Sequence, residues 1–156
     1  MSQFSHFDES GKIKMVDVTD KSITTRTAKA RALVVMSRKT LQLIKSDEIA
    51  KGNPLEIARV SGILAAKNTA QLIPLCHPLA LTHVDVRCEL TEKGIELEAS
   101  ATAEGKTGVE MEALTAVTVA ALTIYDMCKA VDRAISITDV YVAEKKGGRS
   151  GHYQRS

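Results

Sequence analysis

The amino-acid sequence predicts an α+β fold, in which one mostly antiparallel sheet carries helices packed on one face. Residues 81–91 and 95–102 alternate apolar and polar side chains around a Lys93-Gly94 turn, which is typical of a β-hairpin. Residues 109–130 are rich in alanine and apolar on nearly every face, which is typical of a helix buried on more than one side. A hairpin flanked by helical segments favours a sheet covered by helices.

The composition fits a single domain over residues 1–156, with the polar segment 1–11 and the glycine-rich segment 146–156 expected to be flexible. A net charge of +2 and only 3% aromatic residues argue against a nucleic-acid-binding protein. The sequence has neither a signal-peptide pattern nor an uninterrupted apolar run long enough to span a membrane. Its three cysteines are too scattered for a disulfide framework. The chain is therefore expected to be a soluble cytoplasmic protein.

The first half of the chain is expected to hold two strands and two helices. Residues 13–18 resemble a short strand, and residues 24–36 a longer strand that becomes more buried along its length. Ser37 is a candidate N-cap for a helix that ends near Ile44. Pro54 suits the first turn of a second helix, which ends near residue 72. The side chains that this second helix is expected to bury are Ile57, Ala58, Val60, Ile63, Leu64 and Ala66.

The second half contains the hairpin, the long helix and a last strand. Pro74 and Pro78 enclose a loop in which regular structure is disfavoured. Thr107 is expected to cap the helix 109–130, and residues 135–143 are expected to form the last strand. This closing β-β-α-β order matches half of a ferredoxin-like plait. We therefore expect a ferredoxin-like plait with extra N-terminal elements.

Charged residues at both ends of the apolar helix are the first indication of function. Glu110 and Glu112 stand at its start and Asp126 and Lys129 near its end. Charges on a buried helix are costly unless they are paired or used. Asp126 and Lys129 lie three positions apart and therefore share a helix face. They form either a surface ion pair or a pair that apolar neighbours partly desolvate and tune for proton transfer.

Three lysine-glycine segments point to an anionic ligand, because free backbone N–H groups and helix dipoles at such turns attract anions. Each segment is a weak signal by itself, but three in one small domain favour a polyphosphate. These segments are Lys51-Gly52, Lys106-Thr107-Gly108 and 145–149.

His77 lies in the proline-enclosed loop and has two interpretations. It is either a general acid or base, or a group that makes a local hydrogen bond. Cys76 beside it raises the question of a metal. The sequence has no CxxC or HxxxH spacing, so we predict no metal site.

The loop Leu75-Cys76-His77-Pro78 and the blocks 105–115 and 120–130 together closely resemble one enzyme family. It is the cyclic pyranopterin monophosphate synthase family, also called the molybdenum cofactor biosynthesis protein C family. Segments 15–18 and 51–52 agree as well, so the resemblance covers nearly the whole chain.

The resemblance implies a lyase of molybdenum cofactor (molybdopterin) biosynthesis. Its substrate would be (8S)-3′,8-cyclo-7,8-dihydroguanosine 5′-triphosphate, a small molecule derived from GTP. Its products would be cyclic pyranopterin monophosphate and pyrophosphate. The resemblance further implies that no redox cofactor is needed. It implies a homohexamer built as a trimer of dimers, with the active sites at the dimer interface.

Site residues also follow from the resemblance. Asp126 would be the catalytic residue, with Lys51 and Lys129 as its partners in proton transfer. The positions that match substrate-binding segments are Leu75, Cys76, His77, Met111, Glu112, Glu110, Arg26 and Lys145. Lys146 stands where small residues also occur in relatives, so the tail lysine that contacts the triphosphate stays open.

A regulatory α+β module that senses a purine triphosphate without converting it is the alternative from another class of protein. Such a module would use the lysine-glycine turns but would have no use for Asp126 beside Lys129. Release of pyrophosphate from the cyclised GTP intermediate distinguishes the two.

Overall fold

The computed structural model describes residues 10–149 and 151–156, so residues 1–9 of the predicted flexible N-terminus lie outside the described part. The flexibility of segment 146–156 and the assignment of a single domain stay predictions. The helices and strands in chain order are β1 (Thr24–Val35), α1 (Arg38–Lys45), α2 (Pro54–Lys67), α3 (Thr69–Leu72), β2 (Leu81–Leu90), β3 (Gly94–Gly105), α4 (Glu110–Cys128), β4 (Ser136–Lys146) and β5 (Tyr153–Gln154).

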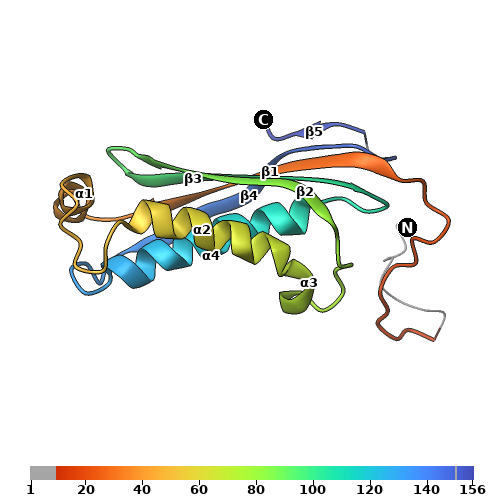
Figure 1. The fold of residues 1–156 in the computed structure, drawn as a ribbon, viewed down its shortest axis with the longest axis horizontal. Helices are drawn as coiled ribbons and strands as arrows, with labels where there is room; N and C mark the ends of the chain where they lie inside the picture. Colours follow the sequence, from red (N-terminus) through yellow and green to blue (C-terminus); the bar gives the residue numbers. More distant parts are fainter. Residues whose placement is uncertain (1–9, 150) are drawn as a thin grey trace.

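The five strands form one sheet in the order β2-β3-β1-β4-β5, and every neighbouring pair is antiparallel. Strands β1 to β4 together with α2 and α4 follow the β-α-β-β-α-β order of a ferredoxin-like plait. Helices α2 and α4 lie side by side on one face of the sheet, while α1 and α3 lie at opposite ends (Figure 1). The predicted α+β class, with helices on one face, is confirmed.

Most element boundaries agree with the sequence patterns. The Ser37 side chain caps α1 by accepting a hydrogen bond from the Thr40 N–H, and Pro54 begins α2 after the N-cap Asn53. The hairpin closes as predicted, with the Thr91 N–H donating to the Gly94 carbonyl at 2.8 Å. Strand β4 begins one residue later and ends three residues later than expected, and β5 was not predicted.

The predicted strand over residues 13–18 is wrong. Only Ile13 makes an isolated bridge, and residues 14–18 have no regular structure. Ile13 and Met15 are 70% and 47% exposed, so the alternating pattern has no sheet to pack on. The carbonyl of Val16 is instead joined to His77 Nε2 by a hydrogen bond of 2.8 Å. This segment therefore crosses the end of the domain without extending the sheet.

Small side chains hold the helical layer close to the sheet. The inner face of β1 contributes Ala28, Ala30, Ala32 and Val34, all at most 4% exposed. Helix α4 contacts α2 and strands β1, β3 and β4, as expected for a helix buried on several sides. Its fully buried alanines are Ala113, Ala116, Ala120 and Ala121.

Among the described residues, α4 is the one helix long and apolar enough to cross a membrane by length and composition. In the most apolar 18-residue stretch of this helix, 56% is buried inside the fold. Packing within this domain therefore accounts for the apolar character of α4.

The ends of α4 differ slightly from the prediction of a helix over residues 109–130. The helix begins at Glu110, after the N-cap Val109, and ends at Cys128. The predicted cap by Thr107 is wrong, because its hydroxyl donates to the adjacent Gly108 carbonyl at 3.4 Å and no side chain caps the helix.

Helix α2 is shorter than expected and turns a different face inwards. It ends at Lys67, where Asn68 is the C-cap, and α3 follows as a separate turn. Its fully buried residues after the first turn are small: Ala58, Gly62, Ala65 and Ala66. The predicted burial of three larger residues is wrong, since Ile57, Val60 and Leu64 are 49%, 64% and 60% exposed. Small residues face α4 because they let the two helix axes approach closely.

Replacing Gly62 with alanine is expected to destabilise the domain by about 1–3 kcal/mol, as in other overpacked cores. A Cβ at this position would lie 2.8 Å from the Ala116 carbonyl oxygen and 3.0 Å from Val86 Cγ2. The backbone of α4 cannot yield cheaply, so the clash outweighs the gain of about 1 kcal/mol in helix propensity. Urea denaturation measures the difference.

Gly105→Ala is the matched control, because its Cβ would meet only Leu79 Cδ2, at 3.8 Å. If Gly62→Ala is as stable as the wild type, the close approach of α2 and α4 is wrong.

Candidate active site

A cavity of about 1030 Å³ opens at the end of the domain where α4 begins. Its walls come from segment 16–22, the start of β1, the loop 73–79, the turn before α4 and the end of β4. All eight residues predicted to bind substrate line it: Arg26, Leu75, Cys76, His77, Glu110, Met111, Glu112 and Lys145. The structure therefore brings together residues that lie up to 119 positions apart (145 − 26).

Basic side chains occupy one part of the cavity wall. Lys145 Nζ lies 2.8 Å from Glu110 Oε1, and both side chains are about one third exposed. Lys106 Nζ donates to the Thr19 carbonyl at 2.6 Å, and Arg26 Nε to the Gly105 carbonyl at 3.4 Å. The hydrogen-bond acceptors of Lys106 and Arg26 are neutral carbonyls, and the Asp17 carboxylate lies within electrostatic range of Lys106 without a direct contact between them. Both cations therefore remain able to attract an anionic ligand to this wall.

Two glycines shape the wall beside Arg26. Gly147 and Gly148 adopt φ angles of +103° and +72°, which residues other than glycine rarely adopt. A Cβ on Gly148 would also collide with the Arg26 guanidinium. The glycine-rich stretch thus lets the backbone pass directly against the arginine that it helps to enclose.

Glu112 is an acidic group set within the same cavity. It is only 4% exposed, although it stands in the first turn of α4. Burial raises the pKa of its carboxyl above the ordinary value, and neighbouring Glu110 raises it further, while its own backbone N–H partly opposes the shift. Burial also raises the pKa of the Cys76 thiol, with a smaller contribution from Glu112. A carboxyl with a raised pKa keeps its proton to a higher pH, as a general acid requires.

The three residues predicted to be catalytic form a second cluster. Asp126 Oδ1 lies 2.7 Å from Lys129 Nζ, and Asp126 Oδ2 lies 2.9 Å from Lys51 Nζ. Lys51 also donates to the Asp126 main-chain carbonyl at 3.0 Å. Lys129 reaches Asp126 from the C-cap of the same helix, whereas Lys51 arrives from the connection between α1 and α2.

Of the two interpretations of Asp126 and Lys129, the structure of one subunit supports the surface ion pair. The side chains of Asp126, Lys129 and Lys51 are 56%, 53% and 48% exposed. Hydrogen bonds from Lys129 and then Lys51 lower the pKa of Asp126 to about 2. Asp126 in turn raises the pKa of Lys129. Within one subunit, therefore, ion pairing and not burial sets these protonation states.

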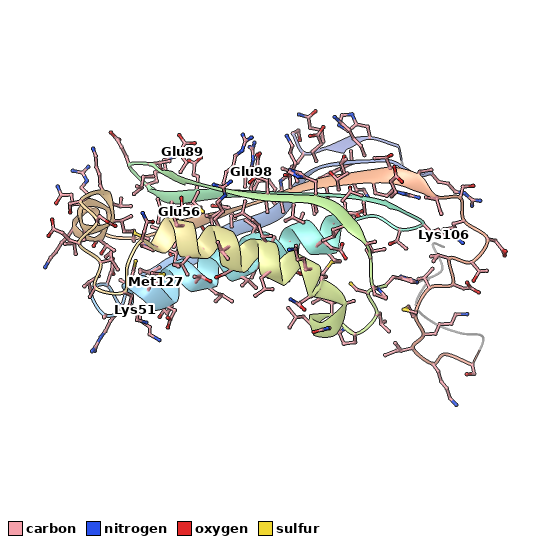
Figure 2. The ribbon with its side chains drawn as sticks, viewed as in Figure 1. Lys51, Glu56, Glu89, Glu98, Lys106 and Met127 are labelled. Carbon is pink, nitrogen blue, oxygen red and sulfur yellow. The ribbon has the colours of Figure 1, made fainter. Side chains whose placement is uncertain are left out.

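The two clusters lie at opposite ends of α4. Glu112 and Asp126 are 14 positions apart (126 − 112), which corresponds to about 21 Å along a straight helix. Figure 2 shows Lys106 at one end of the domain and Lys51 with Met127 at the other. A single subunit does not bring the two sets of residues into one pocket.

Sequence reasoning missed part of the cavity. Lys21, Val16 and Val18 line it, although we placed the two valines on a strand. The local sequence pattern does not indicate that segment 16–22 lies against the loop of His77. The hydrogen bond that holds this segment in place joins Val16 and His77, which are 61 positions apart. Among the described residues, no three His, Cys, Asp or Glu side chains gather as metal ligands would.

Comparison with known proteins identifies the family. The model of the MoaC family matches residues 15–148, a span that contains both clusters. The chain belongs to the MoaC family.

Curated relatives cover nearly the full length of this member of the MoaC family. The cyclic pyranopterin monophosphate synthase of Desulfitobacterium hafniense is 54% identical over 98% of this chain and 94% of its own. The protein of the same name from Heliobacterium modesticaldum is 54% identical over 99% of both chains. The cyclic pyranopterin monophosphate synthase 1 of Mycobacterium bovis is 55% identical over 97% of this chain and 90% of its own.

Proposed function

We propose that this chain is a cyclic pyranopterin monophosphate synthase, a lyase of molybdenum cofactor biosynthesis. The observation that carries the proposal is the near-full-length identity of more than half to relatives of that name. The substrate is (8S)-3′,8-cyclo-7,8-dihydroguanosine 5′-triphosphate. The products are cyclic pyranopterin monophosphate and pyrophosphate.

The cavity has the chemistry that this substrate requires. Closing the cyclic phosphate joins a substrate oxygen to the α-phosphorus, breaks the bond to the bridging oxygen and expels pyrophosphate. Arg26, Lys106 and Lys145 supply positive charge for the triphosphate and for the leaving group. Leu75, Met111 and other apolar lining residues offer a surface for the ring system. Such a mixture of apolar wall and convergent charge is typical of small-molecule sites.

We assign proton transfer to Lys51, Asp126 and Lys129. Rearrangement of the guanine ring moves protons among several heteroatoms, so it needs more than one acid or base. Lys51 and Lys129 are the exchanging groups, and Asp126 orients both, since each of its carboxylate oxygens contacts one ammonium. His77 and Glu112 contact the substrate from the cavity.

We further propose that the enzyme works in the cytoplasm as a homohexamer, a trimer of dimers with its active sites at the dimer interface. The separation of the two clusters along α4 supports a site completed by a second copy. Exposed apolar side chains on the helical layer support the same arrangement, because such surfaces mark protein interfaces. They are Ile57, Val60, Leu64, Leu72, Met111 and Leu122.

An assay for pyrophosphate tests the proposed activity. The purified protein is incubated with the cyclised dihydro-GTP, and pyrophosphate is measured together with the pterin product. We expect stoichiometric release of the two. Binding of the triphosphate without release would instead support the alternative, a regulatory module that senses a purine triphosphate.

Glu112→Gln is expected to raise the melting temperature at pH 8 while lowering turnover. The pKa of Glu112 is higher in the folded protein than in the unfolded chain, so between these two pKa values the folded protein binds more protons. Glu112 therefore lowers the free energy of unfolding as pH rises from the unfolded-state pKa through the folded-state pKa. Glutamine removes this cost. Its advantage should shrink towards pH 4, near the unperturbed pKa of about 4.3.

Melting curves from pH 4 to pH 8 measure the effect, with Glu96→Gln on the exposed face of β3 as the control. A lower melting temperature of Glu112→Gln than of the wild type at pH 8 would contradict it.

A further inference from the structure

Asp132 is a buried carboxylate outside both clusters. It is 8% exposed and lies in the connection between α4 and β4. Its Oδ2 accepts hydrogen bonds from the Ser37 N–H at 2.9 Å and from the Thr40 hydroxyl at 3.0 Å. Its Oδ1 accepts one from the Ala134 N–H at 3.0 Å. Three donors therefore converge on one charged group, and two of them come from residues more than 90 positions earlier in the chain.

This network joins the two segments that carry the Lys51–Asp126–Lys129 cluster. Asp126 and Lys129 stand at the end of α4, directly before Asp132. Lys51 stands in the connection that follows α1, and Ser37 and Thr40 form the start of α1. Asp132 thus fixes the start of α1 against the segment that follows α4.

The exposed ion pairs of the cluster cannot fix this geometry by themselves. Solvent-exposed pairs contribute little, because water screens the charges and long side chains lose entropy when they are held. Buried hydrogen bonds to a charged acceptor are stronger and more directional. The position of Lys51 relative to Asp126 is therefore set mainly by the buried network and not by the contact between them.

Charge as well as hydrogen bonding favours an aspartate here. Helix α1 has no acidic residue in its first turn, which instead carries Arg38 and Lys39. The carboxylate of Asp132 supplies the negative charge that a helix N-terminus prefers. An asparagine in its place would keep one acceptor oxygen and present an N–H₂ group to one of the three donors.

We propose that Asp132 is a positioning residue for proton transfer, which holds the α1 side of the domain so that Lys51 reaches Asp126. This inference rests on the proposed function of that cluster. Removing the carboxylate releases Lys51 and changes none of the side chains that line the substrate cavity. Turnover should then fall while the apparent affinity for substrate stays the same.

Asp132→Asn is expected to lower kcat about tenfold or more with KM unchanged. The decisive readout is a double-mutant cycle with Lys51→Ala, analysed on the residual rate of that variant. If Asp132 acts through Lys51, then Asp132→Asn has little further effect in the Lys51→Ala background. If Asp132→Asn instead damaged the fold in general, the rate of the double variant would fall by the product of the two single-variant losses. Unchanged kcat, or multiplied losses, overturns the proposal.

Two further variants keep the test decisive. Thr40→Val removes one donor to the carboxylate and keeps the side-chain shape, so it should give a smaller loss of the same kind even if Asp132→Asn folds poorly. Asp139→Asn is the control, because Asp139 is exposed and its φ of +54° is one that asparagine tolerates. Thr40→Val with wild-type kcat contradicts the proposal.

A readout without substrate separates this inference from the proposed function. Acylation of lysines by an N-hydroxysuccinimide ester, followed by mass spectrometry, reports the reactivity of each amine. Lys51 should react several times faster in Asp132→Asn than in the wild type or in Asp139→Asn, while Lys145 should not change. If the wild type releases no pyrophosphate, the proposed function fails, and the labelling still decides whether Asp132 positions Lys51. Equal labelling of Lys51 in all three proteins overturns the positioning role.

Discussion

Replacing Lys51 or Lys129 with alanine is expected to reduce turnover by about 100- to 10,000-fold, the usual loss for a general acid or base. Both ammonium groups contact Asp126, at 2.9 Å and 2.7 Å. Alanine leaves no group that can exchange a proton at either position. The remaining lysine cannot replace the missing one, because each contacts a different oxygen of Asp126.

The fold should survive both substitutions. Lys51 and Lys129 are about half exposed, and neither belongs to the core. The kcat for pyrophosphate release measures the loss, and circular dichroism melts establish that each variant is folded. Lys29→Ala is the matched control, since Lys29 pairs with Glu144 on the sheet face that carries no helix. A folded Lys51→Ala or Lys129→Ala variant with near-native kcat would show that its lysine is not an acid or base.

The two segments with the strongest local patterns were predicted well. The alternation in β2 and β3 and the turn at Gly94 set the hairpin, and the apolar alanine-rich stretch set α4. The eight residues that we expect to bind substrate line one cavity, but their binding stays a prediction. Charge and loop patterns singled out His77, Glu110 and Glu112, and the family resemblance supplied residues such as Leu75 and Met111.

Other features depend on contacts that local sequence does not encode. The burial of Ile57, Val60 and Leu64 was predicted wrongly, because the apolar character of a side chain does not reveal whether the rest of the chain covers it. The hydrogen bonds of Asp132 join residues 92 and 95 positions apart, so no window of sequence contains them. Sequence alone also left open whether Asp126 is exposed, because its neighbours Met127 and Cys128 are buried while it faces outwards.

The second large effect is expected from the proposed sharing of one site by two subunits. Glu112 and Asp126 have side chains on nearly the same side of α4, because 14 residues at ~100° each complete almost four turns. They are nevertheless about 21 Å apart along the helix axis. A two-fold axis that pairs α4 with an antiparallel copy brings the Glu112 end of one helix to the Asp126 end of the other. The site is then complete only in the dimer, and each dimer holds two sites.

Mixing two inactive variants is therefore expected to restore activity. Glu112→Ala and Asp126→Ala each damage every site when they are alone. In a mixed dimer, one of the two sites draws its Glu112 and its Asp126 from the intact copies. Random exchange at equal amounts makes half of the dimers mixed, so about a quarter of the sites become intact.

The measurement is the rate of pyrophosphate release by the whole mixture after the two variants have been exchanged at equal amounts, and a tag on one chain shows that mixed dimers have formed. Wild type carried through the same exchange is the control. Each variant must be folded and inactive by itself. Recovery to about a quarter of the wild-type rate is the result that a site shared between subunits predicts. Mixed dimers with no more activity than either variant alone would contradict it, because the site would then lie within one subunit.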